Sequence, residues 1–250
     1  PHLRVDTGNV LRAVAFDHGN TLAEFRWDDG LWRRGVGAML VVAGGDPAQA
    51  GRVATALRRR FERDPADPAE LDYAAAVAEV LGELGLPAPA DVVRRCIEAE
   101  YRCWAPARHV HPQTLALLDG VRALGLRCAV VADTFDPPGL FRADLAAQGI
   151  AARVDAVVLS SELGVRRPHP AVYAAVAAAL DADPAEVMFV GDRLREDVAG
   201  PAEAGMRTCL ATWYRLDPGA RAAAGCVCAE PLDVLGKLKG IVEFRSPGKI

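Results

Sequence analysis

Short apolar runs that alternate with helical patterns are the feature of this chain that most limits how it can fold. Five such runs, rich in Val, Ala and Cys, are predicted to be buried strands, over residues 13–17, 127–133, 154–160, 187–192 and 207–212. Helical patterns at 113–124, 140–148 and 171–180 lie between them, each bounded by a preceding Pro or a following Gly. The alternation predicts an α/β fold with a doubly wound, Rossmann-like parallel sheet, which binds ligands at the carboxyl ends of its strands.

The alternation is interrupted once, between the first strand and the second. Residues 25–112 carry helical patterns and no convincing strand, which predicts an inserted all-helical domain. We therefore expect an α/β core formed by residues 1–24 and 113–250, with a helical cap at 25–112. Near the end of the chain, 226–229 is predicted to be an edge strand and 232–238 a last helix.

Composition and charge favour small-molecule chemistry. Half of the 250 residues are apolar and the formal net charge is -4, whereas binding to nucleic acid or to a membrane surface favours a basic excess. No run approaches the roughly 18 apolar residues that cross a bilayer, and the first residues lack a signal-peptide pattern. We expect a cytoplasmic protein, as a monomer or a homodimer, without a nucleic-acid or membrane partner.

The six cysteines lie in apolar stretches and lack the CxxC spacing of a zinc site. Cys226 and Cys228 form a C-x-C pair, and strand alternation places both side chains on one face of the predicted edge strand. Buried packing is the simpler interpretation of this pair, and metal binding is the alternative.

Aspartates close three of the predicted strands. The first strand ends at Asp17, the second at Asp133 and the fourth at Asp192, and Asp197 follows in the next turn. Carboxylates at one sheet edge repel each other unless a cation lies between them, and such hard oxygen ligands favour Mg²⁺. Helix capping is the simpler explanation for Asp133, whereas no clear helix start follows Asp17 or Asp192.

Three segments, in order along the chain, resemble motifs of the haloacid dehalogenase-like hydrolase superfamily. Ala-Val-Ala-Phe-Asp-His-Gly-Asn-Thr-Leu at 13–22 resembles the first motif, and Ser-Glu-Leu-Gly-Val-Arg-Arg-Pro-His-Pro at 161–170 resembles the third. Val-Gly-Asp-Arg-Leu-Arg-Glu-Asp-Val-Ala-Gly-Pro-Ala-Glu-Ala-Gly-Met at 190–206 resembles the fourth and most specific motif. The helical insert has the position of the family's cap of the first type.

The resemblance implies a hydrolase that uses Asp17 as a nucleophile. Asp17 would attack a phosphoryl group and form an aspartyl-phosphate, which divides a difficult hydrolysis into two steps. Mg²⁺ would be held by Asp17, by the backbone carbonyl of Gly19 and by Asp192, with Asp197 in support.

The same resemblance implies a phosphate-binding loop directly after the nucleophile. Thr21, with its neighbours His18, Gly19 and Asn20, would contact the phosphate oxygens. The implied substrate is a small anionic, phosphorylated metabolite.

The chain departs from the family pattern at three positions. Gly19 stands where the family's phosphatases carry an aspartate that protonates the leaving group, and such general acid help is worth about 10² to 10⁴ in rate. Ala132 replaces the Ser or Thr of the second motif, and Thr134 is its replacement only if the loop runs out of register. Arg167 stands in place of the third motif's lysine, with Arg166 as the alternative.

Further side chains are candidates for substrate contact. His18 titrates near neutral pH, but strand alternation directs it away from Asp17, so a packed histidine is the simpler interpretation. Trp27, just after the first motif, is a candidate to line the substrate entrance together with Asp133 and Thr134 of the second. Tyr101 and Trp104 are expected to fill the core of the cap itself.

Three functions agree with these observations. The leading one is a Mg²⁺-dependent phosphohydrolase acting on substrates with good leaving groups, such as acyl or aryl phosphates, for which the loss at Gly19 costs least. The alternative is a catalytically impaired binding protein that keeps the fold and the metal. A dehalogenase-type reaction on the same scaffold is the third.

Overall fold

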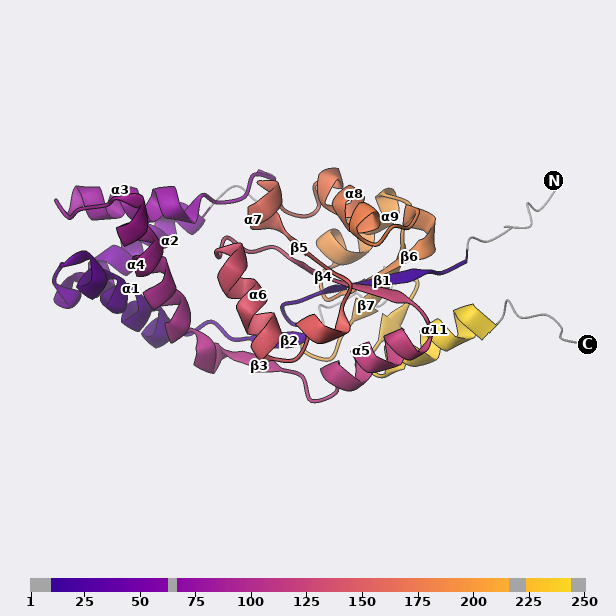
Figure 1. Cartoon of the computed structure of the whole chain (residues 1–250). Helices are drawn as coiled ribbons and strands as arrows, with labels where there is room; N and C mark the ends of the chain where they lie inside the picture. The colour runs from indigo at the N-terminus through magenta and orange to yellow at the C-terminus, as the bar shows by residue number, and fades with distance from the viewer. Residues whose placement is uncertain (1–9, 63–66, 216–223, 244–250) are drawn as a thin grey trace, which may run out of the picture.

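The computed structural model describes residues 10–62, 67–215 and 224–243, and a six-stranded parallel sheet lies at its centre (Figure 1). The strand order is β5-β4-β1-β6-β7-β8. The strands are β1 (Ala13–Asp17), β4 (Arg127–Ala132), β5 (Ala156–Leu159), β6 (Val187–Gly191), β7 (Arg207–Ala211) and β8 (Val227–Cys228). The predicted doubly wound α/β class is confirmed, and the five main strands lie within two residues of their expected bounds.

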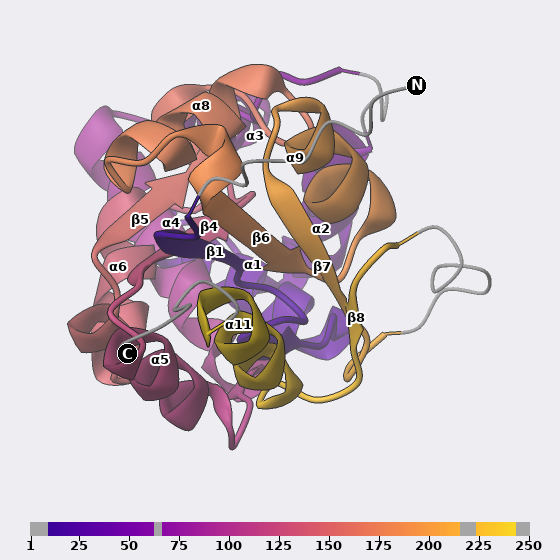
Figure 2. The same cartoon turned by 90° about the vertical axis from the view of Figure 1, so that its right-hand side faces the viewer.

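Helices cover both faces of the sheet (Figure 2). One face carries α5 (Thr114–Ala123), α6 (Pro138–Ala147) and α11 (Asp233–Glu243), and the other carries α8 (Pro170–Ala179) and α9 (Gly200–Glu203). The short α7 (Ser160–Leu163) follows β5. Side chains of β1 point alternately to the two faces, Val14 and Phe16 toward α5 and Ala13 and Ala15 toward α8. Because both faces are buried, β1 is continuously apolar up to Asp17, its last residue.

Four helices lie together beyond the carboxyl ends of the strands: α1 (Asp29–Ala43), α2 (Ala50–Phe61), α3 (Tyr73–Glu83) and α4 (Ala90–Cys103) (Figure 1). They enclose an apolar core of their own, in which Val36, Leu57 and Val77 are completely buried. Local sequence sets the ends of α1, since the Asp28 side chain accepts a hydrogen bond from the Leu31 N–H and Gly44 adopts a left-handed conformation.

The expectation of no strand within 25–112 was wrong for one short segment. Strand β3 (Arg108–Val110) pairs antiparallel with β2 (Ala23–Phe25), so the two connections of the helical segment are hydrogen-bonded to each other. Strands of three residues are too short to produce a recognisable alternation pattern. Among the described residues, no helix has both the length and the apolar character that crossing a membrane requires.

Candidate active site

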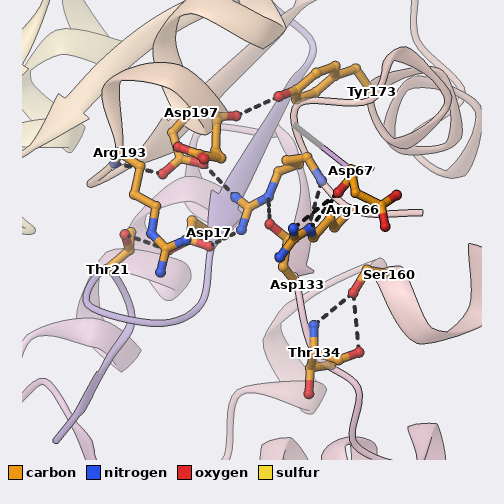
Figure 3. Close-up of polar contacts among 12 residues, drawn as sticks. Asp17, Thr21, Asp67, Asp133, Thr134, Ser160, Arg166, Tyr173, Arg193 and Asp197 are labelled. Carbon is orange, nitrogen blue, oxygen red and sulfur yellow. Dashed lines mark hydrogen bonds and ion pairs between the residues drawn. The ribbon is translucent and has the colours of Figure 1, made fainter. Parts of the chain in front are cut away.

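The strand-end aspartates meet at one edge of the sheet, and Figure 3 shows two of them, Asp17 and Asp133, together with Asp197. Asp17 is the last residue of β1, and Asp133 and Asp192 directly follow β4 and β6, the two strands that flank β1. Asp197 lies on η5 (Leu194–Ala199), a π-helical turn. Asp17, Asp192 and Asp197 are only 4%, 4% and 0% exposed, and one carboxylate oxygen from each lies within 4.8 Å of the other two.

The guanidinium of Arg167 holds three of these carboxylates together. Its distances are 2.7 Å to Asp17 Oδ1, 3.1 Å to Asp133 Oδ2 and 2.5 Å to Asp197 Oδ1. The planar fork of five N–H donors suits this arrangement, because three acceptors can be bonded at once from different sides. One buried cation thus offsets part of the repulsion within the acidic cluster.

Of the two adjacent arginines, Arg167 faces the site. The side chain of Arg166 turns to the loop before α3, where its Nε and Nη2 donate to the backbone carbonyl of Asp67 at 3.3 and 3.1 Å. Its backbone N–H donates to the carbonyl of Pro68. Arg166 therefore joins the segment after α7 to the loop before α3, while Arg167 bonds to the carboxylates.

The helix-capping interpretation of Asp133 was wrong. The Asp133 carboxylate accepts hydrogen bonds from the backbone N–H and the Nε of Arg167, both at 3.1 Å, and helix α6 begins only at Pro138. Thr134, the proposed substitute donor for Ala132, uses its hydroxyl to donate to Asp136 at 2.9 Å, and its N–H donates to Ser160 at 2.7 Å. Thr134 thus orders the loop after β4.

Asp192 differs from the other acids because both of its buried oxygens have no hydrogen-bond partner among the described residues. Burial, with the nearby charge of Asp17 adding to it, raises the pKa of Asp192 to about 7. In contrast, Asp197 accepts from Arg167 and from the Arg193 N–H, and Asp17 accepts from Arg167 and from the Thr21 hydroxyl at 3.1 Å.

This donor set fits a magnesium ion. Unpaired carboxylate oxygens are costly to bury, and Asp17 and Asp192 would hold a divalent cation that compensates for that cost, because Mg²⁺ prefers such hard oxygen ligands. The carboxylate oxygens of Asp197 already accept hydrogen bonds from Arg167 and from the Arg193 N–H. Asp197 therefore supports the site from behind Asp17 and Asp192. Gly191 permits this packing, because a Cβ there would overlap the Asp197 carboxylate.

A cavity of about 290 Å³ opens above Asp17 and extends between the sheet edge and the helical segment. Its floor includes Gly19, Asn20, Ala132 and Thr134. Its roof is aromatic and includes Trp27, Trp32, Phe61 and Trp104 from the helical segment and Phe135 from the loop after β4. An apolar wall opposite a charged floor suits a ligand with one anionic end and one apolar end.

Residues 18–20 shape the floor of this cavity. A Cβ built on Gly19 would meet no atom within 4 Å, so lack of space does not exclude an aspartate there. Asn20 adopts a left-handed conformation with φ 56°, and its N–H donates to the Ala23 carbonyl at 2.7 Å, which closes a tight turn.

His18 lines the same cavity from the side of helix α6. Its ring packs edge to face against Phe141 with 4.9 Å between ring centres, and its Nε2 is buried without a partner among the described residues. Burial lowers the pKa of His18 to about 4, so the imidazole is neutral at pH 7. A neutral ring that packs on Phe141 is a poor proton donor at that pH.

A family model described as a haloacid dehalogenase-like hydrolase matches residues 11–205, which include every strand of the sheet except β7 and β8. The chain belongs to this family. The matched residues include all four aspartates of the acidic cluster, Asp17, Asp133, Asp192 and Asp197. They also include the four inserted helices α1 to α4.

Curated relatives are similar to shorter segments. A glyceraldehyde 3-phosphate phosphatase of Methanopyrus kandleri is 44% identical over 52 residues, which cover 21% of this chain and 22% of that protein. A phosphoserine phosphatase of Thermus thermophilus is 33% identical over 112 residues, 45% of this chain and 42% of that protein. The chain thus spans less than half the length of these relatives.

Solved structures of the family share the fold over nearly the full length. A HAD phosphatase from Thermococcus onnurineus superposes with a TM-score of 0.61 at 18% identity, covering 92% of this chain and 98% of that one. A 2-haloacid dehalogenase from Pseudomonas syringae has a TM-score of 0.64 at 16% identity, covering 94% and 99%. At 16% and 18% identity, this likeness establishes the fold alone. The two proteins are named for different reactions.

Several cavity residues of this family member escaped the sequence analysis. Glu100 is buried in the roof, its carboxylate accepts a hydrogen bond from Trp104 Nε1, and burial raises its pKa to about 7. A signal for it existed, because Glu100 interrupts the apolar helical stripe that runs from Cys96 and Ile97 to Trp104.

Tyr101 does not fill the core of the cap, contrary to our expectation. Its hydroxyl donates to Asp144 of α6 at 2.9 Å, and the Arg108 guanidinium lies 3.7 Å from the centre of its ring. Arg108 also pairs with Asp144 at 2.6 Å, so these three residues connect α4, β3 and α6 beside the cavity. Trp104 belongs to the apolar core of the helices and also lines the cavity.

Proposed function

We propose that this chain is a Mg²⁺-dependent phosphohydrolase that forms an aspartyl-phosphate on Asp17 and acts on a small phosphorylated metabolite with a good leaving group. The observation that carries the proposal is that Asp17, on the floor of the cavity, lies beside Asp192, whose two buried carboxylate oxygens have no hydrogen-bond partner in the part of the chain that the structure describes. The names of the curated relatives, both phosphatases, agree with phosphoryl transfer.

The residues around Asp17 prepare it as a nucleophile. The Thr21 hydroxyl donates to one carboxylate oxygen and Arg167 to the other, which fixes the plane of the carboxylate at the cavity floor. Asp17, Asp192 and the Gly19 carbonyl would hold Mg²⁺, which when bound offsets the repulsion between the anionic nucleophile and the anionic phosphate. Arg167 stays cationic throughout and offsets further negative charge.

The class of substrate follows from Gly19 and from the aromatic roof. Because residue 19 has no side chain to protonate a departing oxygen, the leaving group must be stable as an anion, as in acyl and aryl phosphates. Trp27, Trp32 and Trp104 provide an apolar surface for an aryl group. An aryl phosphate therefore matches both the missing acid and the lining of the cavity.

A hydrolysis assay with Mg²⁺ tests this proposal on one aryl, one acyl and one alkyl phosphate. We expect turnover of the first two, at least about 10²-fold slower turnover of the alkyl ester, and loss of all activity with EDTA or with Asp17→Asn. Asp181→Asn, at a side chain that is 92% exposed, is the matched control and should keep full activity. Absence of turnover for every class in the presence of Mg²⁺ contradicts the proposal.

The alternative of a binding protein rests on two losses at one site. Gly19 and Ala132 both lack groups that act on the phosphoryl group in the family's phosphatases, although the acids at positions 17 and 192 are kept. Calorimetric titration separates the two functions. Binding of Mg²⁺ and of a phosphate mimic, combined with no turnover of any ester, favours the binding protein.

A further inference from the structure

Three cysteines meet on the opposite side of β6 from Asp17, at the far edge of the sheet. Cys209 is on β7, Cys228 is on β8, and Cys226 lies directly before β8. The Cys209 sulfur lies 2.7 Å from the Cys226 sulfur and 3.3 Å from the Cys228 sulfur, and all three sulfurs lie within 4.8 Å of one another. None of them lines the cavity above Asp17.

The pairing of β7 with β8 builds this cluster. Leu210 is opposite Val227 in the parallel register, and the Leu210 N–H donates to the Cys226 carbonyl at 2.9 Å, so Cys209 and Cys226 are lateral neighbours. Strand alternation then puts Cys228 on the same face as Cys226. Figure 2 shows β8 beside β7 at the sheet edge, with α11 on the face that these side chains share.

The burial of the cluster differs among its members. Cys209 and Cys228 are 0% and 1% exposed, whereas Cys226 is half-buried and provides access. The Cys226 thiol donates to the Cys209 sulfur, and the Cys209 sulfur is in turn in contact with that of Cys228. Cys226 is therefore the member of the cluster that an ion from solvent reaches first, and metal ions bind such groups as thiolates.

The chemistry of the donors selects the ligand. Thiolates prefer soft ions such as Cu(I) and Zn²⁺, and no histidine or carboxylate among the described residues joins the cluster as a fourth ligand. Zn²⁺ in structural sites takes four protein ligands, so a three-sulfur set in an apolar layer suits Cu(I) better. We propose that Cys209, Cys226 and Cys228 form a three-thiolate site for a soft metal ion, Cu(I) in the first place.

Binding at this site exchanges the three thiol protons for the ion and needs no oxidant or reductant. The ion joins β8, a strand of only two residues, to β7 under the cover of α11. Metal uptake should therefore stabilise this edge of the sheet independently of the acidic cluster.

Titration of the fully reduced full-length protein with Cu(I), in competition with a chromogenic Cu(I) chelator, tests the proposal. We expect one Cu(I) per chain, at least about 100-fold weaker binding in Cys226→Ser and in Cys209→Ala, and no change in Cys103→Ser. A concentration of Cu(I) 100-fold above Kd should raise Tm by about 5 to 10 °C. Asp192→Asn should bind Cu(I) as the wild type does, which separates this site from the acidic cluster.

Two results would overturn the proposal. One is Cu(I) uptake that is equal in the wild type and in Cys226→Ser, when circular dichroism shows that both proteins are folded. The other is absence of Cu(I) uptake by the reduced protein, together with a mass loss of about 2 Da in air that maps to a Cys209–Cys226 disulfide. In that case the cluster is a pair of oxidisable thiols with a third beside it.

Discussion

Replacing Asp192 by Asn should make the metal-free protein more stable, although it removes a residue of the proposed magnesium site. Both Asp192 oxygens are buried without partners among the described residues, and the Asp17 carboxylate lies close by. Without a cation, an ionised Asp192 is therefore a cost to the folded state. The amide of asparagine has nearly the same shape and no charge.

The pKa of Asp192 gives the size of this effect. A rise from 3.8 to about 7 is about 3 units, and each unit corresponds to 1.36 kcal/mol, so ionised Asp192 costs about 4 kcal/mol above pH 7. The buried amide still lacks hydrogen-bond partners, which costs about 1 to 3 kcal/mol. The net expectation is a gain of about 1 to 3 kcal/mol in the free energy of unfolding at pH 8.

The direction with pH follows from the raised pKa. In the unfolded chain the carboxyl releases its proton near pH 4, whereas the folded protein keeps it until about pH 7. The stability of the wild type relative to Asp192→Asn therefore falls between these pH values and is constant above them. Saturating Mg²⁺ should reverse the order, because only the wild type offers the full ligand set.

Urea unfolding in EDTA at pH 5 and pH 8, repeated with Mg²⁺, measures these differences. Asp181→Asn, at the exposed side chain used above, should leave the midpoint unchanged under all conditions. If Asp192→Asn does not differ from the wild type at pH 8 in EDTA, the argument from unpartnered oxygens is wrong. If Mg²⁺ stabilises both proteins equally, Asp192 is not a metal ligand.

Three further predictions concern the cavity and its acids. Gly19→Asp should raise alkyl phosphate hydrolysis by about 10² to 10⁴, because its side chain has room and restores an acid. Gly139→Asp, at an exposed position in the first turn of α6, should change nothing in the same assay. Arg167→Met should lower the free energy of unfolding in EDTA by about 3 to 5 kcal/mol, since three carboxylates lose their shared cation, and Arg166→Met should cost clearly less by urea unfolding. Glu100→Gln should stabilise the protein at pH 8 by up to about 3 kcal/mol, because burial raises the pKa of Glu100 from 4.5 to about 7. This gain should vanish below pH 4.5. A difference in the free energy of unfolding between variant and wild type that is the same at pH 4 and pH 8 contradicts the prediction.

The sequence alone determined the layers of this protein and the place of its chemistry. Apolar runs such as 13–17 are long enough to reveal buried strands, and the carboxyl ends of parallel strands must lie at one edge. The sequence therefore predicts that Asp17 and Asp192 lie close together. These inferences need only periodicity and the direction of the chain, which are local properties.

Only the tertiary structure decided which side chains meet. Arg166 and Arg167 are chemically alike, and their loop has no periodic pattern that indicates which one turns inward. Asp133 bonds to Arg167, a partner 34 residues away, although its local sequence suits a helix cap. Cys209, the third cysteine of the cluster, lies on β7, and its position beside Cys226 and Cys228 depends on the register of β7 against β8. Contacts of this kind are set by packing between distant segments, so they exist only once the chain has folded.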